Sequence, residues 1–229
     1  MSYFGGKGNC RSRVIGAMPS HRVYIETHLG GGAVMRAKRP SERQIGIDAD
    51  QRVVDAWRSA SPPCEVVHSD AVAFLRGFAF SGEELVYADP PYPLETRASG
   101  NRYRHDYGDL DHAELLDTLL GLPCNVLVSG QPTRLYQERL AGWRRIDFRS
   151  GARSGARTET LWANYPDSLP LHEPARAGAD FRERERSKRR VATVRRKIER
   201  LTAAERSVLV QWLFRSYPGH VPGSGEEVA

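Results

Sequence analysis

The chain has 229 residues, of which 40% are hydrophobic and 27% charged, enough for one full α/β domain and a small addition. No apolar run approaches the ~20 residues of a membrane span, and the opening MSYFGGKGNCRSR lacks the apolar core of a signal peptide, so we expect a cytoplasmic protein without membrane contact. Cys10, Cys64 and Cys124 are far apart in the sequence and lack metal-ligand spacing, which excludes a disulfide framework. We expect three reduced thiols and no bound metal.

Positive charge is concentrated near the C-terminus. The chain carries a net charge of +6, whereas residues 176–215 alone hold 13 basic and 5 acidic residues, a net of +8, and the remainder has a net of −2. A near-neutral body with one basic segment favours a polyanionic partner. A solvated, arginine-rich helix is equally compatible with the charge alone.

Short apolar runs alternate with helix-like stretches through the first 141 residues. Each run has four to six residues and ends at a polar, glycine or proline signal, which is typical of buried parallel strands. The predicted strands are 22–27, 44–47, 65–67, 84–88 and 125–129. The predicted helices are 32–38, 51–60, 71–77, 111–121 (with Asp111 as a plausible N-cap) and 133–141. This alternation predicts a doubly wound parallel sheet.

The pattern changes after about residue 145. Residues 145–149 and 158–165 predict a closing hairpin, giving a Rossmann-like, mainly parallel α/β sheet of about seven strands with helices on both faces. We expect the α/β domain at 1–166, a linker at 167–180, a small basic helical extension at 181–217 and a disordered tail at 218–229. Within the extension, a charged helix is predicted at 183–201. Thr202 and Glu205 then predict a capping box for a second helix, whose apolar side is formed by Val208, Leu209, Trp212 and Leu213.

A glycine cluster follows the first predicted strand. Gly30, Gly31 and Gly32 allow positive φ and a close approach of the backbone to a ligand, although turn formation alone would also explain them. Asp48 closes the next strand, where an acid accepts hydrogen bonds from ribose hydroxyls in nucleoside-binding α/β folds. The dinucleotide fingerprint is incomplete, because its last glycine is missing. A nucleoside without a pyrophosphate is therefore favoured, and S-adenosylmethionine fits that description.

The fourth predicted strand ends at Asp89-Pro90-Pro91-Tyr92. The lone pair of a base amino group is delocalised into its ring, so such a group is a poor nucleophile. The Asp89 carboxylate and the Pro90 carbonyl can accept its two N–H bonds and release the lone pair. Pro91 stiffens the loop, and Tyr92 offers a flat face for a flipped-out base. A tight turn at a strand end is the simpler alternative.

Several blocks of the sequence occur in a fixed order: Tyr3 to Lys7, Glu26 with Gly30 to Gly32, Asp48 to Asp50, His68 to Asp70, and the tetrad. Together they resemble the Dam-like family of DNA adenine-N6 methyltransferases, over roughly residues 3–166. The resemblance implies S-adenosylmethionine as cofactor, duplex DNA with a flipped-out adenine as substrate, and the tetrad from Asp89 to Tyr92 as catalytic. It also implies a cofactor pocket, and the residues assigned to that pocket are Tyr3, Lys7, Glu26, His28, Gly30, Gly31, Gly32, Asp48 and Asp70.

Two departures from the family stand out. Thr27-His28 replace the usual Pro-Phe before the glycines, so a packing role and a cofactor contact for His28 are weighed evenly. Only 19 residues, Gln51 to Ser69, lie where these enzymes carry a target-recognition insertion, which predicts short or relaxed sequence specificity. The remaining candidates for nucleic-acid contact are Arg97, Arg102, Tyr103, Arg104, Tyr107, Arg153, Arg157, Lys188, Arg189 and Arg190.

Two further hypotheses stay open at this point. The tetrad serves any amino acceptor, so the substrate can also be adenine in RNA, or the amino group of cytosine or guanine. A non-catalytic DNA-binding protein on the same fold is the third hypothesis, and the intact tetrad disfavours it. The sequence does not determine the oligomeric state.

Overall fold

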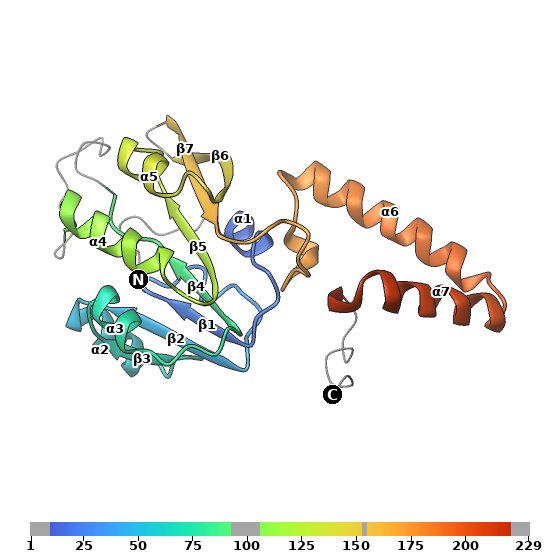
Figure 1. Cartoon of the computed structure of the whole chain (residues 1–229), viewed down its shortest axis with the longest axis horizontal. Coiled ribbons are helices and arrows are strands. Elements are labelled where there is room, and N and C mark those ends of the chain that lie inside the picture. The colour runs from blue at the N-terminus through green and yellow to red at the C-terminus, as the bar shows by residue number, and fades with distance from the viewer. Residues whose placement is uncertain (1–9, 93–105, 153–154, 221–229) are drawn as a thin grey trace.

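The computed structural model describes residues 10–92, 106–152 and 155–220, with the side chains of these residues other than 150–157. Within them, one mixed sheet has the strand order β3-β2-β1-β4-β5-β7-β6 (Figure 1). β1 to β5 run parallel, and β7 is antiparallel to both β5 and β6. The predicted Rossmann-like sheet with a terminal hairpin is confirmed. The strands are β1 (Val23–Glu26), β2 (Arg43–Asp48), β3 (Glu65–His68), β4 (Glu84–Ala88), β5 (Asn125–Gly130), β6 (Arg144–Ala152) and β7 (Gly155–Ala163).

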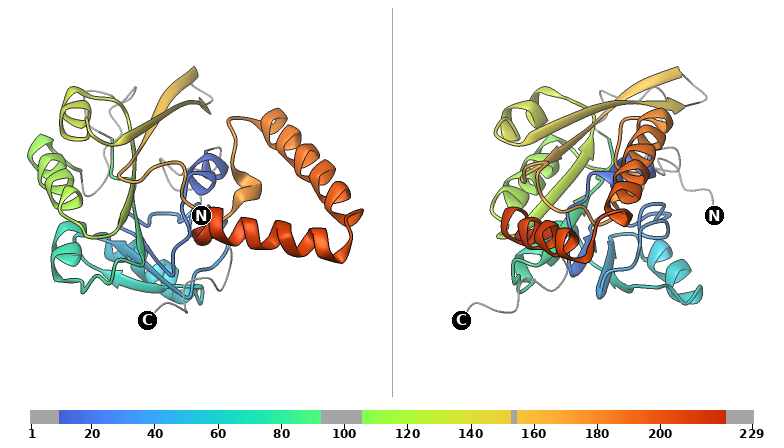
Figure 2. Two further views of the ribbon diagram at one scale, coloured as in Figure 1. Left: turned by 45° about the vertical axis from the view of Figure 1, so that its right-hand side comes forward. Right: turned by 90° about the vertical axis from the view of Figure 1, so that its right-hand side faces the viewer.

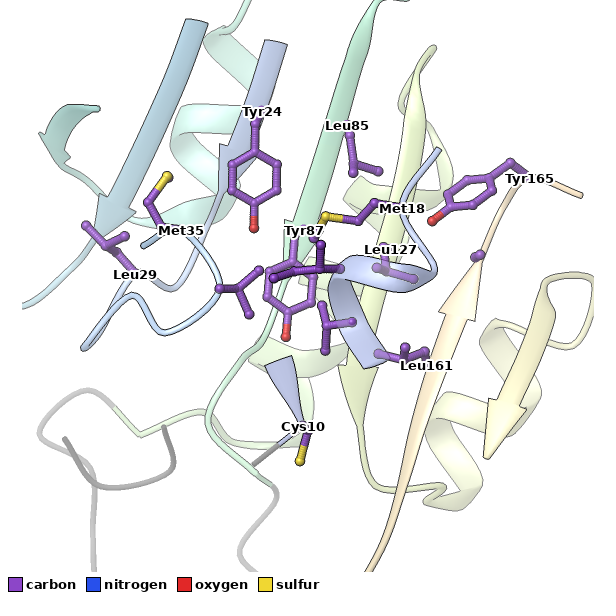
Figure 3. Close-up of a cluster of buried hydrophobic side chains, with 14 of the residues drawn as sticks. Cys10, Met18, Tyr24, Leu29, Met35, Leu85, Tyr87, Leu127, Leu161 and Tyr165 are labelled. Carbon is purple, nitrogen blue, oxygen red and sulfur yellow. The ribbon is translucent and has the colours of Figure 1, made fainter. Parts of the chain in front are cut away.

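Helices cover both faces of the sheet, as predicted, and each face has its own hydrophobic core. One core joins α1 (Arg11–Gly16) and α2 (Gln51–Ser59) to side chains such as Tyr24, Tyr87 and Leu127 (Figure 3). The other joins α3 (Ala71–Gly77), α4 (Asp109–Leu120) and α5 (Arg134–Arg139) to the opposite face. Every residue of β4 is buried, because this central strand is covered on both sides.

The helix predicted at 32–38 is wrong, because the structure has a series of turns there. Gly30 and Gly32 have φ of 46° and 58°, a left-handed conformation that a right-handed helix does not contain. The short helix α1 was not predicted from the sequence. Helix α4 starts at Asp109, with Gly108 as its N-cap and the Asp111 carboxylate accepting a hydrogen bond from the Gly108 N–H.

The segment expected to be a linker is fastened to the domain. Leu171 forms an antiparallel bridge with Pro19, and Arg39 donates a hydrogen bond to the His172 carbonyl at 2.6 Å. Arg176 lies in the 3-10 helix η2 (Pro174–Arg176) and donates to the carbonyl of Ala37 at 2.7 Å. The helical extension therefore starts from a segment that is held against the domain, and we call residues 171–176 the anchor segment.

Two long helices follow the anchor segment and project from the body (Figures 1 and 2). They are α6 (Phe181–Glu199) and α7 (Ala203–Ser216), and neither contains a buried residue. The capping box of Thr202 and Glu205 is confirmed. The apolar side predicted for the second helix is present but largely uncovered, since Val208 and Trp212 are 67% and 52% exposed. A short 3-10 helix, η3 (Pro218–His220), ends the described chain, and none of the described helices is long and apolar enough to span a bilayer.

Candidate functional site

The segments that follow β1 and β4 lie side by side at one edge of the sheet. Glu26 is in register with Tyr87, and the N–H of Thr27 donates to the Tyr87 carbonyl at 3.1 Å. Because both strands are parallel, their carboxyl ends bring the glycine turn and the Asp89 tetrad to the same edge. In open α/β sheets this is the edge where ligands bind.

Asp48 organises the glycine turn. Its Oδ2 accepts a hydrogen bond from the Gly30 N–H at 2.8 Å, and its Oδ1 accepts one from the Asp50 N–H at 2.9 Å. Each carboxylate oxygen has two lone-pair directions, so these backbone contacts are compatible with further donors such as ribose hydroxyls. The predicted pairing of the glycine cluster with this acid is therefore a direct contact.

Trp57 braces the same turn from α2, a contact that no local pattern in the sequence predicts. Its indole Nε1 donates to the Gly30 carbonyl at 2.8 Å. A Cβ added to Gly32 would lie 2.0 Å from the Trp57 ring. The third glycine is thus required both by its positive φ and by the tryptophan packed against it.

His28 lies between the glycine turn and the segment that precedes α4. Its Nδ1 is 2.8 Å from the Thr27 hydroxyl, and its Nε2 is 3.2 Å from the Tyr107 hydroxyl. Burial lowers the pKa of His28 to about 3, so the imidazole is neutral at physiological pH. A neutral ring avoids repulsion with a cationic ligand.

Asp70 is the second acid at this edge and the N-cap of α3, where its carboxylate accepts from the Ala73 N–H at 3.0 Å. Its negative charge acts on His28, opposing the effect of burial on the histidine pKa. The same charge adds to burial in raising the pKa of Tyr107. His28 and Tyr107 are thus in direct contact, and the charge of Asp70 influences both.

Glu26 is 3% exposed and is the last residue of β1. The Tyr24 hydroxyl donates to its Oε2 at 2.9 Å, and the Met35 backbone also supplies a hydrogen bond. Burial raises the pKa of Glu26 to about 8. The structure thus buries this predicted cofactor residue at the end of β1.

Asp89 is anchored by a short hydrogen-bonded chain that sequence inspection missed. The Ser129 hydroxyl donates to Asp89 Oδ1 at 2.7 Å, and Ser129 Oγ is 3.0 Å from the Tyr87 hydroxyl. Because the serine proton is directed to the carboxylate, the Tyr87 hydroxyl donates to the serine oxygen. Tyr87 and Ser129 are 0% and 1% exposed, so Asp89 is held from the interior of β4 and β5.

Tyr92, the last residue of the tetrad, is tied to the terminal hairpin. Its hydroxyl lies 2.7 Å from both carboxylate oxygens of Glu159, a residue of β7 that is 6% exposed. Between Asp89 and Tyr92, Pro90 is buried and Pro91 half-buried. The tetrad is therefore fixed at both ends, by β5 through Ser129 and by β7 through Glu159.

The predicted nucleic-acid residues that the structure describes lie in three different places. Arg157 belongs to β7, opposite Ser150, and Lys188, Arg189 and Arg190 lie on α6. Tyr107 is placed against His28. The predicted residues that lie outside the described part of the chain are Tyr3, Lys7, Arg97, Arg102, Tyr103, Arg104 and Arg153.

The described residues fit S-adenosylmethionine in their chemistry. Asp48 stands at the end of β2 for ribose hydroxyls, and Asp70 stands at the neighbouring end of β3, where the Ser69 N–H donates to the Asp48 carbonyl at 3.2 Å. The left-handed turn at Gly30 and Gly32 lies at the same edge, and Trp57 fills the space beside Gly32. No group of histidine, cysteine and acidic side chains within the described ranges could hold a metal ion.

No protein-family model and no curated protein matches the sequence. Among solved structures, the chain is similar to the 23S rRNA methyltransferase ErmE, with 15% identity, 72% of this chain and 71% of that chain covered, and a TM-score of 0.46. It is also similar to a dimethyladenosine transferase from Plasmodium falciparum, with 11% identity, coverage of 71% and 62%, and a TM-score of 0.46. A magnesium protoporphyrin IX methyltransferase from Synechocystis PCC 6803 with bound SAM has 12% identity, coverage of 68% and 76%, and a TM-score of 0.45. At these values the similarity leaves the reaction and the substrate of this chain undetermined.

Proposed function

We propose that the chain transfers a methyl group from S-adenosylmethionine to the N6 amino group of adenine in DNA, with short or relaxed sequence specificity. The observation that carries this proposal is the anchored tetrad. Asp89 is held by Ser129 at 2.7 Å, and Tyr92 is held by Glu159 at 2.7 Å, beside the Asp48-bound glycine turn. The ordered sequence blocks that resemble Dam-like enzymes support the choice of adenine and DNA.

Asp89 performs the main chemical task in this proposal. Its carboxylate and the Pro90 carbonyl accept the two N–H bonds of the target amino group, which draws the nitrogen towards sp³ and frees its lone pair. The anchoring by Ser129 fixes the acceptor before substrate arrives, so little reorganisation is needed during the reaction. After transfer, the extra proton on the nitrogen leaves to the carboxylate or to water.

Tyr92 performs the positioning task. Its ring provides a stacking face for a base that has left the duplex, and the hydrogen bond to Glu159 limits rotation of that ring. Asp48, Asp70 and His28 hold the cofactor. When bound, S-adenosylmethionine supplies a methyl group on a positively charged sulfur, so the reaction needs neither a metal nor a strong base.

The short interval between Asp50 and Asp70 supports relaxed specificity. It contains only α2 and β3, and both are used in the sheet and its core. No segment of this interval extends as a separate module that could place several side chains against base edges.

The decisive experiment incubates the protein with labelled S-adenosylmethionine and either unmethylated duplex DNA or RNA, followed by nucleoside mass spectrometry. We expect N6-methyladenine in the DNA. Methylation of RNA alone, or of cytosine or guanine, would replace the proposed substrate and keep the chemistry. Cofactor binding without any transfer would support the non-catalytic alternative.

A further inference from the structure

Helix α6 carries nine basic and three acidic residues, a net charge of +6 that equals the net charge of the whole chain. The tetrad and the cofactor residues make no use of this charge. The helix contains no buried residue, so its arginines are not required for the hydrophobic core of the domain. The electrostatic free energy of so many like charges on one helix is unfavourable in the absence of an anionic partner.

The basic residues form a defined face. Arg182, Arg186, Arg189 and Thr193 recur at intervals of four, three and four residues, which places them along one side of the helix. Together with Arg190, they line an open groove on the surface of the helix. We call the four arginines of this set the arginine face.

Carboxylates leave most of this face without an ion pair, although the charge of Asp180 interacts with Arg182. Glu185, the acidic residue that also lines the groove, pairs instead with Lys188 at 3.8 Å. Glu183 is engaged at the start of the helix, where its carboxylate accepts from the Ala179 N–H. Among the described residues, no ion pair involves Arg186, Arg189 or Arg190. The spacing of Arg186 and Arg190 by one turn is itself repulsive.

The helix that carries the arginine face begins directly after the anchor segment. Arg176 binds the Ala37 carbonyl at 2.7 Å and the Glu173 carboxylate at 2.7 Å, directly before the helix begins. The helix then projects away from the sheet, as Figure 1 and the left view of Figure 2 show. Arg182 and Arg189 are separated by about 10 Å along the axis, at ~1.5 Å per residue. A DNA strand offers about three phosphates over that length, at ~3.4 Å per nucleotide.

We infer that the arginine face binds the phosphates of duplex DNA and adds affinity that is independent of sequence. This inference rests on the proposed function for the choice of DNA. Guanidinium groups pair with phosphate oxygens in a bidentate manner, and backbone contacts of this kind position a protein on DNA without reading its bases. The two projecting helices α6 and α7, here called the arm, thereby supply affinity for DNA that the short interval between Asp50 and Asp70 does not.

The test compares two double variants of the full-length chain that remove equal charge from α6. R186Q/R189Q removes two arginines of the face, and R184Q/R195Q removes two cations from the opposite side of the same helix. Binding to a fluorescent duplex is measured over a salt series without cofactor, so the result does not depend on methyl transfer. Circular dichroism first checks that the helix content is unchanged, and glutamine preserves helix propensity.

Each phosphate contact contributes about 0.9 to the slope of log K against log salt. We expect R186Q/R189Q to reduce the slope by about 1.8 and to weaken binding, while R184Q/R195Q keeps the wild-type slope. An unchanged slope in R186Q/R189Q would overturn the inference. Equal losses in both variants would also overturn it, because they would indicate a diffuse effect of net charge. If the wild-type chain methylates DNA and R186Q/R189Q binds normally, the proposed function survives and only the role of the arm fails.

Discussion

The two charged regions of this molecule are built in opposite ways. At the carboxyl edge of the sheet, Asp89 and Tyr92 are held by the buried side chains of Ser129 and Glu159. On α6, the arginine face has no buried residue behind it, and within the described ranges Arg186, Arg189 and Arg190 form no ion pair. Transfer chemistry depends on geometry held to a fraction of an ångström, whereas phosphate binding depends mainly on the number of charges. The two regions therefore differ in how their side chains are held: those at the sheet edge have buried hydrogen-bond partners, and those on α6 are exposed.

Removing the Asp89 carboxylate should give the largest effect. Asp89→Ala loses the acceptor for the target amino group, and we expect methyl transfer to fall by at least about 10²-fold, as when one preorganised hydrogen-bonding group is removed from an active site. The rate is measured with labelled cofactor on duplex DNA. Cofactor affinity by calorimetry should stay within a few-fold of wild type, and wild-type turnover in this variant would contradict the mechanism.

The next effect concerns the tyrosine and its anchor. Tyr92→Ala should cost roughly 1–3 kcal/mol in combined base binding and rate, because it removes the stacking face. Tyr92→Phe and Glu159→Gln keep the ring and disturb only the hydrogen bond between them, so we expect smaller losses. Fluorescence of 2-aminopurine at the target position reports base flipping. A full base-flipping signal and normal rate in Tyr92→Ala would mean that another side chain stacks on the base.

Cofactor binding should depend on Asp48. Asp48→Ala removes the acceptor for ribose hydroxyls and also the hydrogen bond to the Gly30 N–H, so affinity for S-adenosylmethionine should fall about tenfold or more. Asp48→Asn is the matched control, because it retains an acceptor oxygen for the turn. Calorimetry that finds wild-type affinity in both variants would place the nucleoside elsewhere. Lys7→Ala is expected to weaken binding as well, on the resemblance alone.

The free energy of unfolding should depend on pH through Glu26, the buried last residue of β1. The pKa of Glu26 is raised by burial from 4.5 to about 8, so the folded state holds its proton more tightly than the unfolded chain. The stability that Glu26 contributes is complete below pH 4.5 and is lost as pH rises through about 8. Glu26→Gln should therefore lose less stability than wild type across that window, with ~1.4 kcal/mol for each pKa unit of difference. Parallel pH profiles from urea unfolding would contradict the assigned protonation.

The smallest effect should be on the choice of methylated sites when the arm is removed. A chain that ends at Gly178 lacks the arm but keeps the anchor segment with Arg176. We expect weaker DNA binding and a lower salt slope, but the same set of methylated sequences, because phosphate contacts carry no base information. Sequencing of methylated sites checks this. A changed set of sites would mean that the arm reads bases.

Local sequence patterns predicted the sheet well. The apolar run at 84–88 coincides with β4, and Asp48 and Asp89 stand at strand ends as expected, because a strand between two layers of helices must be apolar throughout. The helix predicted at 32–38 was wrong, because apolar spacing alone does not show that Gly30 and Gly32 adopt a left-handed conformation.

The supporting residues of the site could not be predicted in the same way. Ser129 is 40 residues from Asp89, and Glu159 is 67 residues from Tyr92. Nothing local in the sequence links them, because their contacts exist only once β5 has paired with β4 and β7 with β5. Trp57 is a similar case, since an apolar helix position gives no sign that its indole nitrogen binds the Gly30 carbonyl.

The most direct test of the central claim is nucleoside mass spectrometry on duplex DNA treated with the wild-type protein, with Asp89→Ala as the matched control. We expect N6-methyladenine to accumulate with the wild-type protein and to stay at background with the variant. Accumulation at equal rates with both proteins would contradict the assignment of Asp89, and a methylated base other than adenine, or none at all, would contradict the proposed reaction.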